Sequence, residues 1–417
     1  MEYGLIGEHL PHSFSPEIHR RIGDYKYELK ELSPDEVGAF LARRDFKGIN
    51  VTIPYKQAVI PYLDEIDNAA KAIGAVNTVV NRGGKLFGYN TDFGGLKALI
   101  EQTGVSAAGK KALIFGNGGT SKTAFAVLKA LGAKTVLKAS ILGEEGTISY
   151  DEARAEHSDA EILINTTPCG MFPNLEGMAA DPMDFPAAKA VIDVVYNPLK
   201  TDLIQRAEAL GIPCRGGLYM LVKQAILAAE HFFDEKIPPE KAEGIYREIL
   251  KSKENIVLIG MPASGKSTVG KLLSESLSRP LFDSDDLVAE TAGKTIPEIF
   301  SSEGEEAFRR LEAKAVAALS GKTGAVIATG GGAVLNPENI RYLKKNGRIY
   351  FIDRPVESLV PTGDRPTASS REAIMKRYEE RYPLYNKYCD VRTDASGSAL
   401  EVLEAVKEDF LNEDFSY

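Results

Sequence analysis

The sequence predicts an α/β protein with parallel sheets, divided into two or three domains. Short apolar runs rich in β-branched residues each precede a longer segment of helical periodicity, as at Lys111 to Phe115, Asn255 to Ile259 and Ala325 to Ala328. This alternation of strand and helix is typical of parallel α/β architecture. The length of 417 residues exceeds that of a single small module, since a domain has roughly 150 residues.

The composition excludes several classes of protein. The 44% of hydrophobic residues is enough for folded cores, and the net charge of -9 argues against a general affinity for nucleic acid or anionic membranes. The three cysteines are too few and too scattered for a disulfide framework or a metal cluster. The first residues lack the charge pattern of a signal peptide, and no apolar run reaches the about 18 residues that a membrane helix needs. We therefore expect a soluble, cytoplasmic protein with no nucleic-acid or membrane partner.

A domain boundary is expected near residue 253. The stretch from Ile237 to Glu254 contains two consecutive prolines, continues in a charged helical pattern and ends where a new apolar run begins. About 253 residues precede this break and about 164 follow it, and both lengths suit independently folding units.

The clearest motif is a phosphate-binding loop that follows the apolar run at Asn255 to Ile259 and precedes a helical run from Thr268 to Leu277. Residues 260–267 form a complete G-x-x-x-x-G-K-S pattern. The glycines allow backbone N–H groups to surround phosphate oxygens, while Lys266 neutralises the β- and γ-phosphates and Ser267 supplies an oxygen to Mg²⁺. The start of the following helix adds a favourable dipole for the anion. The expected ATP-binding residues are Gly260, Met261, Pro262, Ala263, Ser264, Gly265, Lys266, Ser267 and Thr268.

Four further segments accompany this loop. They are Phe282-Asp283-Ser284-Asp285, Phe308-Arg309 with Glu312, Ala328-Thr329-Gly330-Gly331-Gly332, and Arg381-Tyr382-Pro383-Leu384-Tyr385. Each segment alone has a structural alternative, because Asp-Ser-Asp often caps a helix, an Arg often lies on a solvated face and three glycines often form a loop. In this order and spacing the segments resemble shikimate kinase, a small fold of the nucleoside-monophosphate-kinase type, over nearly all of residues 254–417.

That resemblance implies phosphoryl transfer from ATP to a hydroxyl of shikimate, with Lys266, Asp285 and Arg365 as catalytic residues. Asp283 would hold Mg²⁺ together with Ser267. The family's lid carries an Arg-Pro pair that falls on Arg365, whereas Pro361 stands where a first Arg is expected, and the lid is a few residues short. Arginine forks suit a small carboxylate, and glycines permit a close approach of the backbone. The implied shikimate ligands are Asp285, Arg309, Gly330, Gly331, Gly332 and Arg381.

A second nucleotide motif lies in the first 250 residues. The strand at Ala112 to Phe115 leads into Gly116-Asn117-Gly118-Gly119-Thr120-Ser121 and a helical run, which supplies the first two glycines of a dinucleotide fingerprint. The next strand ends at Lys138-Ala139-Ser140, about 22 residues after Gly116, and no acidic residue follows before Glu144. Because an NAD site uses a carboxylate there, Lys138 and Ser140 favour NADP over NAD.

Six segments spread over residues 1–235 complete this pattern. They are Gly7 to His19, Asn50 to Lys56, Gly74 to Thr78, Asn90 to Asp92, Asn165 to Pro168 and Gly217 to Gln224. An isolated Lys and Asp would more often form a surface ion pair than a catalytic pair. Together, in this order, the six segments resemble shikimate dehydrogenase.

This second resemblance implies reduction of 3-dehydroshikimate by NADPH at a catalytic pair, Lys56 and Asp92. Lys56 would stabilise developing negative charge and donate a proton, and Asp92 would orient the substrate hydroxyl. The implied substrate ligands are Ser13, Ser15, Thr52, Asn77, Tyr196 and Gln224, whose hydroxyl and amide groups suit a polyhydroxylated ring. The implied nucleotide ligands are Gly116, Asn117, Gly118, Gly119, Thr120, Ser121, Lys138, Thr166, Gly217 and Met220. The family often has Asn-Arg-Thr where this chain has Lys138-Ala139-Ser140, which weakens the expected preference for NADP.

We therefore expect a bifunctional enzyme in which the product of the first reaction is the substrate of the second. Residues 1–253 would be the dehydrogenase, with a substrate lobe (1–101 and 216–250) and a Rossmann-type NADP lobe (102–215), and residues 254–417 would be the kinase. Two alternatives remain open. The first part could act on quinate or a related cyclic hydroxy acid. The second part could be a non-catalytic nucleotide-binding regulatory module, an alternative motivated by the short lid.

Overall fold

The computed structural model describes residues 1–10, 13–360 and 370–412, which form two compact units. The first unit comprises residues 1–197 and 201–249. The second comprises the residues from Leu250 onward together with the short earlier segment 198–200. The division falls within α9 (Pro239–Lys253), a few residues before the boundary expected near residue 253.

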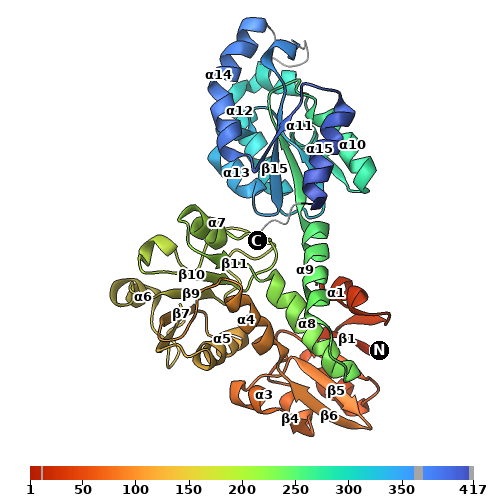
Figure 1. The fold of residues 1–417 in the computed structure, drawn as a ribbon, viewed down its shortest axis with the longest axis vertical. Coiled ribbons are helices and arrows are strands. Elements are labelled where there is room, and N and C mark those ends of the chain that lie inside the picture. Colours follow the sequence, from red (N-terminus) through yellow and green to blue (C-terminus); the bar gives the residue numbers. More distant parts are fainter. Residues whose placement is uncertain (11–12, 361–369, 413–417) are drawn as a thin grey trace. The chain divides into compact units, whose positions relative to one another are not determined.

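The first unit contains a mixed sheet of order β2-β1-β3-β5-β6-β4 (Figure 1). Its strands are β1 (Tyr3–Gly7), β2 (Tyr27–Glu31), β3 (Gly48–Val51), β4 (Glu65–Ile66), β5 (Thr78–Arg82) and β6 (Lys85–Tyr89). The helices of this part of the chain are α1 (Ser15–Ile22), α2 (Pro34–Arg43), α3 (Asn68–Ile73) and the single-turn η1 (Ile60–Tyr62). Helix α8 (Leu218–Phe233), from much later in the chain, packs Ala228 and Phe232 against Tyr3 and Val80 of this sheet.

This sheet departs from the parallel arrangement that the sequence predicts. Strand β5 runs antiparallel to both β3 and β6. The two residues between β5 and β6, Gly83 and Gly84, have φ of 60° and 90°. A two-residue hairpin turn needs positive φ at both positions, which glycine adopts without strain, so this pair permits the reversal.

The second sheet of the first unit is entirely parallel, in the order β11-β10-β9-β7-β8. Its strands are β7 (Lys111–Phe115), β8 (Thr135–Ala139), β9 (Ile162–Asn165), β10 (Ala190–Asp193) and β11 (Cys214–Arg215). Alternate residues of β7 enter two clusters. Ala112 and Ile114 pack with α4 (Thr91–Glu101) and α5 (Gly119–Ala130), and Leu113 and Phe115 pack with α6 (Tyr150–Glu156) and α7 (Asp202–Ala209). The single-turn η2 (Pro182–Asp184) lies between β9 and β10 in the chain.

The second unit is also built on a parallel sheet, in the order β13-β14-β12-β15-β16. Its strands are β12 (Asn255–Ile259), β13 (Leu281–Asp283), β14 (Val326–Ala328), β15 (Gly347–Asp353) and β16 (Val391–Asp394). Ile256 and Leu258 pack with α10 (Lys266–Leu277) and α15 (Ala399–Asn412) on one face. Val257 and Ile259 pack with α12 (Ile296–Leu319), α13 (Pro337–Leu343) and α14 (Arg371–Tyr388) on the other. Helix α11 (Ser284–Ala292) and the single turns η3 (Ala333–Leu335) and η4 (Val356–Ser358) complete this unit.

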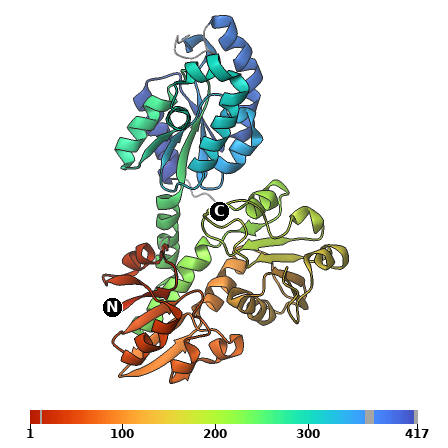
Figure 2. The ribbon, with the colours of Figure 1, turned by 180° about the vertical axis from the view of Figure 1, so that it is seen from behind.

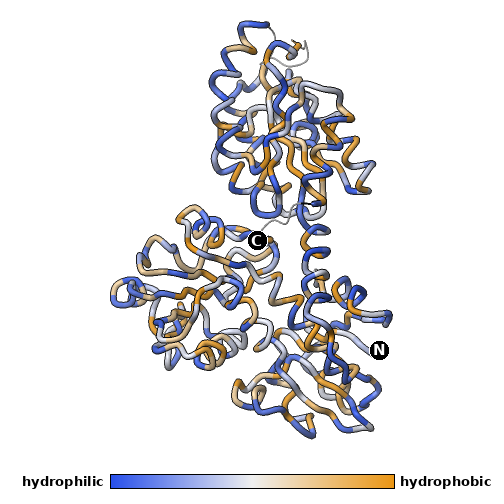
Figure 3. Tube along the Cα trace, in the orientation of Figure 1, coloured by the Kyte–Doolittle hydropathy of each residue, from blue (hydrophilic) through white to orange (hydrophobic). Residues whose placement is uncertain are grey.

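The sheets are the apolar centres of both units. Views from opposite sides show helices covering both faces of the sheet in the second unit (Figures 1 and 2). In both units, hydrophobic residues gather along the strands of the parallel sheet (Figure 3). The strands expected at Lys111 to Phe115 and Asn255 to Ile259 have those bounds, and the one expected at Ala325 to Ala328 begins one residue later. Among the described residues, no helix combines the length and the apolar character needed to span a membrane.

Candidate active sites

A cavity of about 470 Å³ in the first unit collects side chains from many parts of the chain. Loops after β1 and β3, the starts of α4 and α8 and the segment after β10 all contribute to its wall. It brings together all six expected substrate ligands and both expected catalytic residues: Ser13, Ser15, Thr52, Lys56, Asn77, Asp92, Tyr196 and Gln224. Gly217 and Met220, expected at the nucleotide, also line this cavity.

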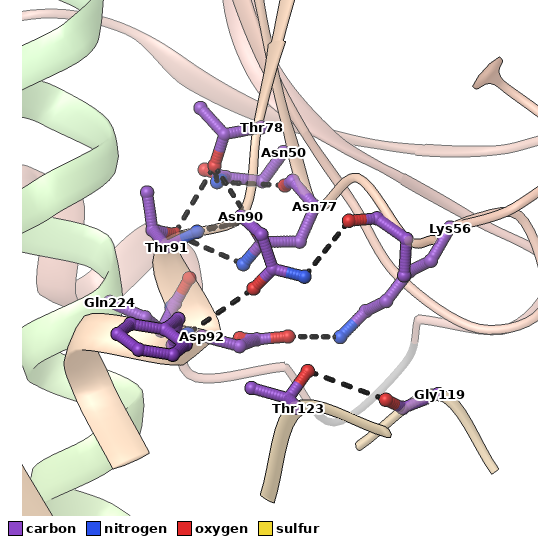
Figure 4. A network of polar contacts seen from close by, with 12 residues as sticks. Asn50, Lys56, Asn77, Thr78, Asn90, Thr91, Asp92, Gly119, Thr123 and Gln224 are labelled. Atoms are coloured by element: carbon purple, nitrogen blue, oxygen red, sulfur yellow. Dashed lines mark hydrogen bonds and ion pairs between the residues drawn. The ribbon is translucent and has the colours of Figure 1, made fainter. Parts of the chain in front are cut away.

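Lys56 and Asp92 form a close ion pair inside this cavity (Figure 4). Lys56 Nζ donates to Asp92 Oδ2 at 2.5 Å, and the side chains are 18% and 9% exposed. Asp92 lies in the first turn of α4, where the helix dipole favours a carboxylate. The pair therefore presents an ammonium whose position is held by a fixed anion and which retains access to the cavity.

A buried amide network fixes Asn77 beside this pair (Figure 4). Asn77 Oδ1 accepts from Thr91 N at 2.7 Å, and Asn77 Nδ2 donates to Thr91 Oγ1 at 3.0 Å. Asn50 Nδ2 donates to Thr78 Oγ1 at 3.0 Å, and Asn50 Oδ1 accepts from the Tyr27 hydroxyl at 2.7 Å. Asn50, Thr78 and Thr91 were not predicted as site residues, although all three lie inside the segments Asn50 to Lys56, Gly74 to Thr78 and Asn90 to Asp92. Asn50 lines the cavity itself.

A second cavity of about 850 Å³ follows the carboxyl ends of β7, β8 and β9. Its lining includes the expected nucleotide ligands Gly116, Asn117, Gly118, Gly119, Thr120 and Thr166. Gly116 has φ of 112°, and a Cβ atom there would lie 2.7 Å from Thr166 Oγ1, so only glycine fits without strain. A Cβ atom on Gly118 or Gly119 would meet no atom within 4 Å, which leaves the N-terminus of α5 open to an anion.

Two expected nucleotide ligands have other surroundings. Ser121 is fully buried, and its hydroxyl donates to Gly116 O at 2.8 Å, so it stabilises the turn from within. Lys138 Nζ donates to Asn117 Oδ1 at 2.6 Å, and Lys138 is not among the residues that line the cavity. Glu144, the first acidic residue after β8, does line it.

The two cavities meet at three shared residues, Ile53, Lys56 and Thr120. A ligand that fills the second cavity from the glycine turn toward Lys56 would reach the wall of the first. The geometry therefore suits transfer between a dinucleotide and a polar small molecule, with the Lys56 ammonium at the point of transfer.

The second unit carries the phosphate-binding loop between β12 and α10. Gly260 and Gly265 have φ of 149° and 96°, and these positive φ values allow the tight turns of the loop. Lys266 Nζ donates to Gly260 O at 2.9 Å and Met261 O at 2.8 Å. The Ser264 hydroxyl is buried and has no hydrogen-bond partner among the described residues. These are features of a loop whose donors can turn to phosphate oxygens.

Ser267 and Asp283 lie together at the end of this loop. The Ser267 hydroxyl donates to Asp283 Oδ2 at 3.0 Å, and Asp283 Oδ1 accepts from Asp285 N at 2.9 Å. One hydroxyl and one carboxylate suit Mg²⁺, which takes most of its remaining ligands from water and phosphate. In the described part of the chain, no group of three or more His, Cys, Asp or Glu residues could hold a metal without such help.

The glycines at 330–332 pass close to charged side chains. A Cβ atom on Gly330 would lie 2.4 Å from Asp285 Oδ1, and one on Gly332 would lie 2.1 Å from Arg309 Nη1. Arg381, 3% exposed, donates from Nη1 to Gly331 O at 3.2 Å, while its buried Nε has no hydrogen-bond partner among the described residues. The expected shikimate ligands of this unit therefore converge on one place. Arg365 and Pro361 lie outside the described residues.

Glu312 is a further member of this cluster that was not predicted as a site residue. Its Oε2 accepts from Arg309 Nη1 at 2.8 Å, and its side chain is 1% exposed. Burial raises the pKa of the Glu312 carboxyl, and the nearby Arg309 guanidinium opposes this rise. The carboxylate fixes the position of Arg309 near Gly332.

These features define a two-lobed, dinucleotide-dependent oxidoreductase joined in one chain to a P-loop phosphotransferase. Comparison with known proteins gives the families. Residues 5–79 match the model "Shikimate dehydrogenase substrate binding domain", and residues 262–410 match the model "Shikimate kinase". The chain belongs to the shikimate dehydrogenase family and carries a shikimate kinase domain, which makes it a bifunctional shikimate-pathway enzyme, as the sequence predicts.

Individual relatives agree with this assignment. "Shikimate dehydrogenase (NADP(+))" of Clostridium perfringens is 37% identical over 265 residues, which cover 59% of this chain and 97% of the relative. A solved shikimate 5-dehydrogenase of Thermus thermophilus, in complex with NADP(H) and shikimate, is 28% identical with a TM-score of 0.54 and covers 60% of this chain and 99% of its own. One of Listeria monocytogenes, in complex with shikimate and NAD, is 29% identical with a TM-score of 0.51 and covers 59% and 96%.

Proposed function

We propose that the first unit reduces 3-dehydroshikimate to shikimate with NADPH and that the second unit phosphorylates shikimate with ATP. The observation that carries the first reaction is the Lys56–Asp92 pair at the place where the two cavities meet. The convergence of Asp285, Arg309 and Gly330–Gly332 beside the phosphate-binding loop supports the second. The proposed division is residues 1–253 for the reductase, with lobes 1–101 plus 216–250 and 102–215, and residues 254–417 for the kinase.

In the reductase, Lys56 completes the reduction by transferring a proton. When bound, the reduced nucleotide supplies a hydride to the carbonyl carbon of the substrate. Lys56 donates a proton from Nζ to the carbonyl oxygen, which becomes the new hydroxyl, and Asp92 holds the ammonium in position. Ser13, Ser15, Thr52, Asn77, Tyr196 and Gln224 bind and orient the polyhydroxylated ring.

The nucleotide of the reductase is proposed to lie along the second cavity. Its pyrophosphate would approach Gly116, Asn117, Gly118, Gly119 and Thr120 at the start of α5, because that helix end favours an anion. Thr166, Gly217 and Met220 would border the nicotinamide end. Ser121 supports this turn from behind, through its bond to Gly116 O.

In the kinase, the residues act chiefly by positioning and by charge. When bound, ATP supplies the phosphoryl group, and Ser267 and Asp283 would hold its Mg²⁺. The loop from Gly260 to Thr268 surrounds the phosphates, with Lys266 neutralising developing charge. Asp285 orients the attacking hydroxyl, and Arg309, Arg381 and Gly330–Gly332 bind the carboxylate and ring. We assign Arg365 to charge stabilisation on the basis of its Arg-Pro sequence.

A single assay tests both reactions. The full chain is mixed with 3-dehydroshikimate, NADPH, ATP and Mg²⁺, and nucleotide oxidation and ADP formation are followed separately. We expect both, with ADP formation dependent on NADPH until shikimate is added directly. In the reverse direction, oxidation of quinate but not of shikimate by NADP⁺ would show that quinate, and not shikimate, belongs to the reductase reaction. Failure to release ADP in the presence of added shikimate would contradict the second reaction.

A further inference from the structure

The loop that follows β8 places the Glu144 carboxylate in the wall of the second cavity, the one proposed to hold the nucleotide. Residues 140–147 form an excursion closed by two backbone hydrogen bonds, Ser140 N to Ile148 O and Ile148 N to Lys138 O, both 2.9 Å. The Thr147 hydroxyl donates to Glu144 O at 2.6 Å and anchors the return. Glu144 consequently lines the cavity next to Asn117 and Ser140, at the carboxyl end of the second strand of this Rossmann-type sheet.

The Glu144 carboxylate is ionised and can accept a further hydrogen bond. The Ser140 hydroxyl, with smaller contributions from Asn117 and Lys138, holds the pKa of this carboxyl below its usual range. Its Oε2 is buried and has no hydrogen-bond partner among the described residues. A buried carboxylate oxygen needs a donor, and a hydroxyl of a bound ligand would supply one.

The same end of the cavity is poor in positive charge. Of the described residues that line the cavity, only Lys56 is a Lys or Arg, and it is paired with Asp92 where the two cavities meet. The Lys138 ammonium is bonded to Asn117 Oδ1 and lies outside the lining. A ribose 2′-phosphate bound at this end would lie beside the Glu144 carboxylate. It could pair with the Lys138 ammonium only if Lys138 gave up its hydrogen bond with Asn117.

Two apolar side chains stand beside Glu144. Ile141 and Leu142 line the cavity and are 81% and 77% exposed. Large apolar side chains gain from being covered, and an adenine ring offers a flat apolar face. The surroundings of Glu144 therefore match the adenosine end of a dinucleotide.

We propose that Glu144 determines nucleotide specificity: it accepts a hydrogen bond from the 2′-hydroxyl of the adenosine ribose and disfavours a 2′-phosphate, so that the first unit uses NAD(H) alongside NADP(H). This inference rests on the proposed reductase function and extends its range of cofactors. It assigns to Glu144 the role that an acidic residue closer in sequence to the glycine turn has in NAD-binding Rossmann folds.

The test compares kcat/KM for NADH and NADPH in the full chain, with 3-dehydroshikimate as substrate. We expect the value for NADH to be at least one tenth of that for NADPH. Glu144→Gln, which keeps the shape and removes the charge, should lower the NADH-to-NADPH ratio at least tenfold. Glu145→Gln removes the same charge from an exposed neighbour and should leave the ratio within twofold. Ser140→Ala, which removes the donor to Glu144, should shift the ratio in the same direction by a smaller factor.

Direct binding separates this inference from the reductase function. Because the chain has no tryptophan, binding of NADH and NADPH can be followed by the fluorescence of the nucleotide itself. Binding of both nucleotides without turnover would contradict the proposed reaction and leave the role of Glu144 standing. An NADH-to-NADPH ratio below one tenth, or equal shifts in Glu144→Gln and Glu145→Gln, would overturn the role of Glu144 and leave the reductase standing. If the chain binds neither NADH nor NADPH, both the reductase function and the role of Glu144 are overturned.

Discussion

Lys56 Nζ lies 2.5 Å from Asp92 Oδ2, although the two residues follow different strands of the mixed sheet. Lys56 follows β3, and Asp92 lies in the first turn of α4, the helix that follows β6. Strand β5 lies between β3 and β6 and runs antiparallel to both, so the carboxyl ends of β3 and β6 meet at one edge. The hairpin at Gly83 and Gly84 therefore helps to bring Lys56 and Asp92 together.

Lys56→Ala should strongly impair reduction of 3-dehydroshikimate and leave shikimate phosphorylation unchanged. The variant loses the proposed proton donor, together with the cation proposed to stabilise the nascent alkoxide, and loss of such a group lowers kcat by about 10²-fold to 10⁴-fold. The matched change in the second unit, Lys266→Ala, should do the reverse, because it removes the cation at the phosphates. Loss of both activities in either variant would contradict two separable sites.

Tyr27→Phe should weaken substrate binding in the first unit without removing any group that touches the substrate. The change deletes the hydrogen bond that Asn50 Oδ1 accepts, which frees Asn50 to rotate away from Thr78 Oγ1 and Asn77 O, to which its Nδ2 donates. One such bond contributes about 1 kcal/mol, so we expect KM for 3-dehydroshikimate to rise about fivefold, with a smaller effect on kcat. Tyr62→Phe, at a partly exposed tyrosine, is the control. An unchanged KM would show that the amide network does not position Asn77.

Gly332→Ala should impair the kinase selectively. The added Cβ would lie 2.1 Å from Arg309 Nη1, so the guanidinium must leave its place beside Glu312. We expect KM for shikimate to rise at least tenfold, with the KM for ATP changed less. Gly244→Ala, whose Cβ would meet no atom within 4 Å, should leave both constants unchanged. Equal effects on both substrates would place the damage in the phosphate-binding loop instead.

His19 should make the stability of the first unit depend on pH. It is fully buried, its ring stacks on Tyr27 at 3.7 Å, and burial lowers its pKa to about 3. Between pH 6.5 and 3 the unfolded chain binds a proton that the folded unit excludes, so the free energy of unfolding falls as the pH falls. The slope from this residue is at most about 1.4 kcal/mol per pH unit.

Urea unfolding followed by circular dichroism at pH 7, 6 and 5 measures this slope. In His19→Gln the contribution of the imidazole is absent, so its stability should fall less steeply than that of the parent chain. His9→Gln, at an exposed histidine, should keep the parent slope. Parallel curves for the parent and His19→Gln would show that the buried ring does not control this dependence.

Both nucleotide-binding turns could be located from the sequence. A strand, a glycine turn and a helix are adjacent in the chain, so the spacing from Gly116 to Thr120 and from Gly260 to Ser267 largely sets the local geometry. The bounds of β7 and β12 followed from the same runs of β-branched residues, because a strand buried on both faces is apolar throughout. The families and the two-enzyme organisation followed in turn from the order of such local motifs.

The surroundings of individual side chains depended on contacts between distant segments. Ser121 belongs to the glycine motif, yet it faces inward because its hydroxyl satisfies Gly116 O. Lys138 turns to Asn117, and Glu144 takes its place at the cavity because the loop after β8 folds back on the strand. The sequence alone predicts turns and helix faces, because these depend on residues that are close together in the chain. Which side chain lines a cavity is decided by strand order and loop closure, whose hydrogen bonds join residues that no local pattern relates.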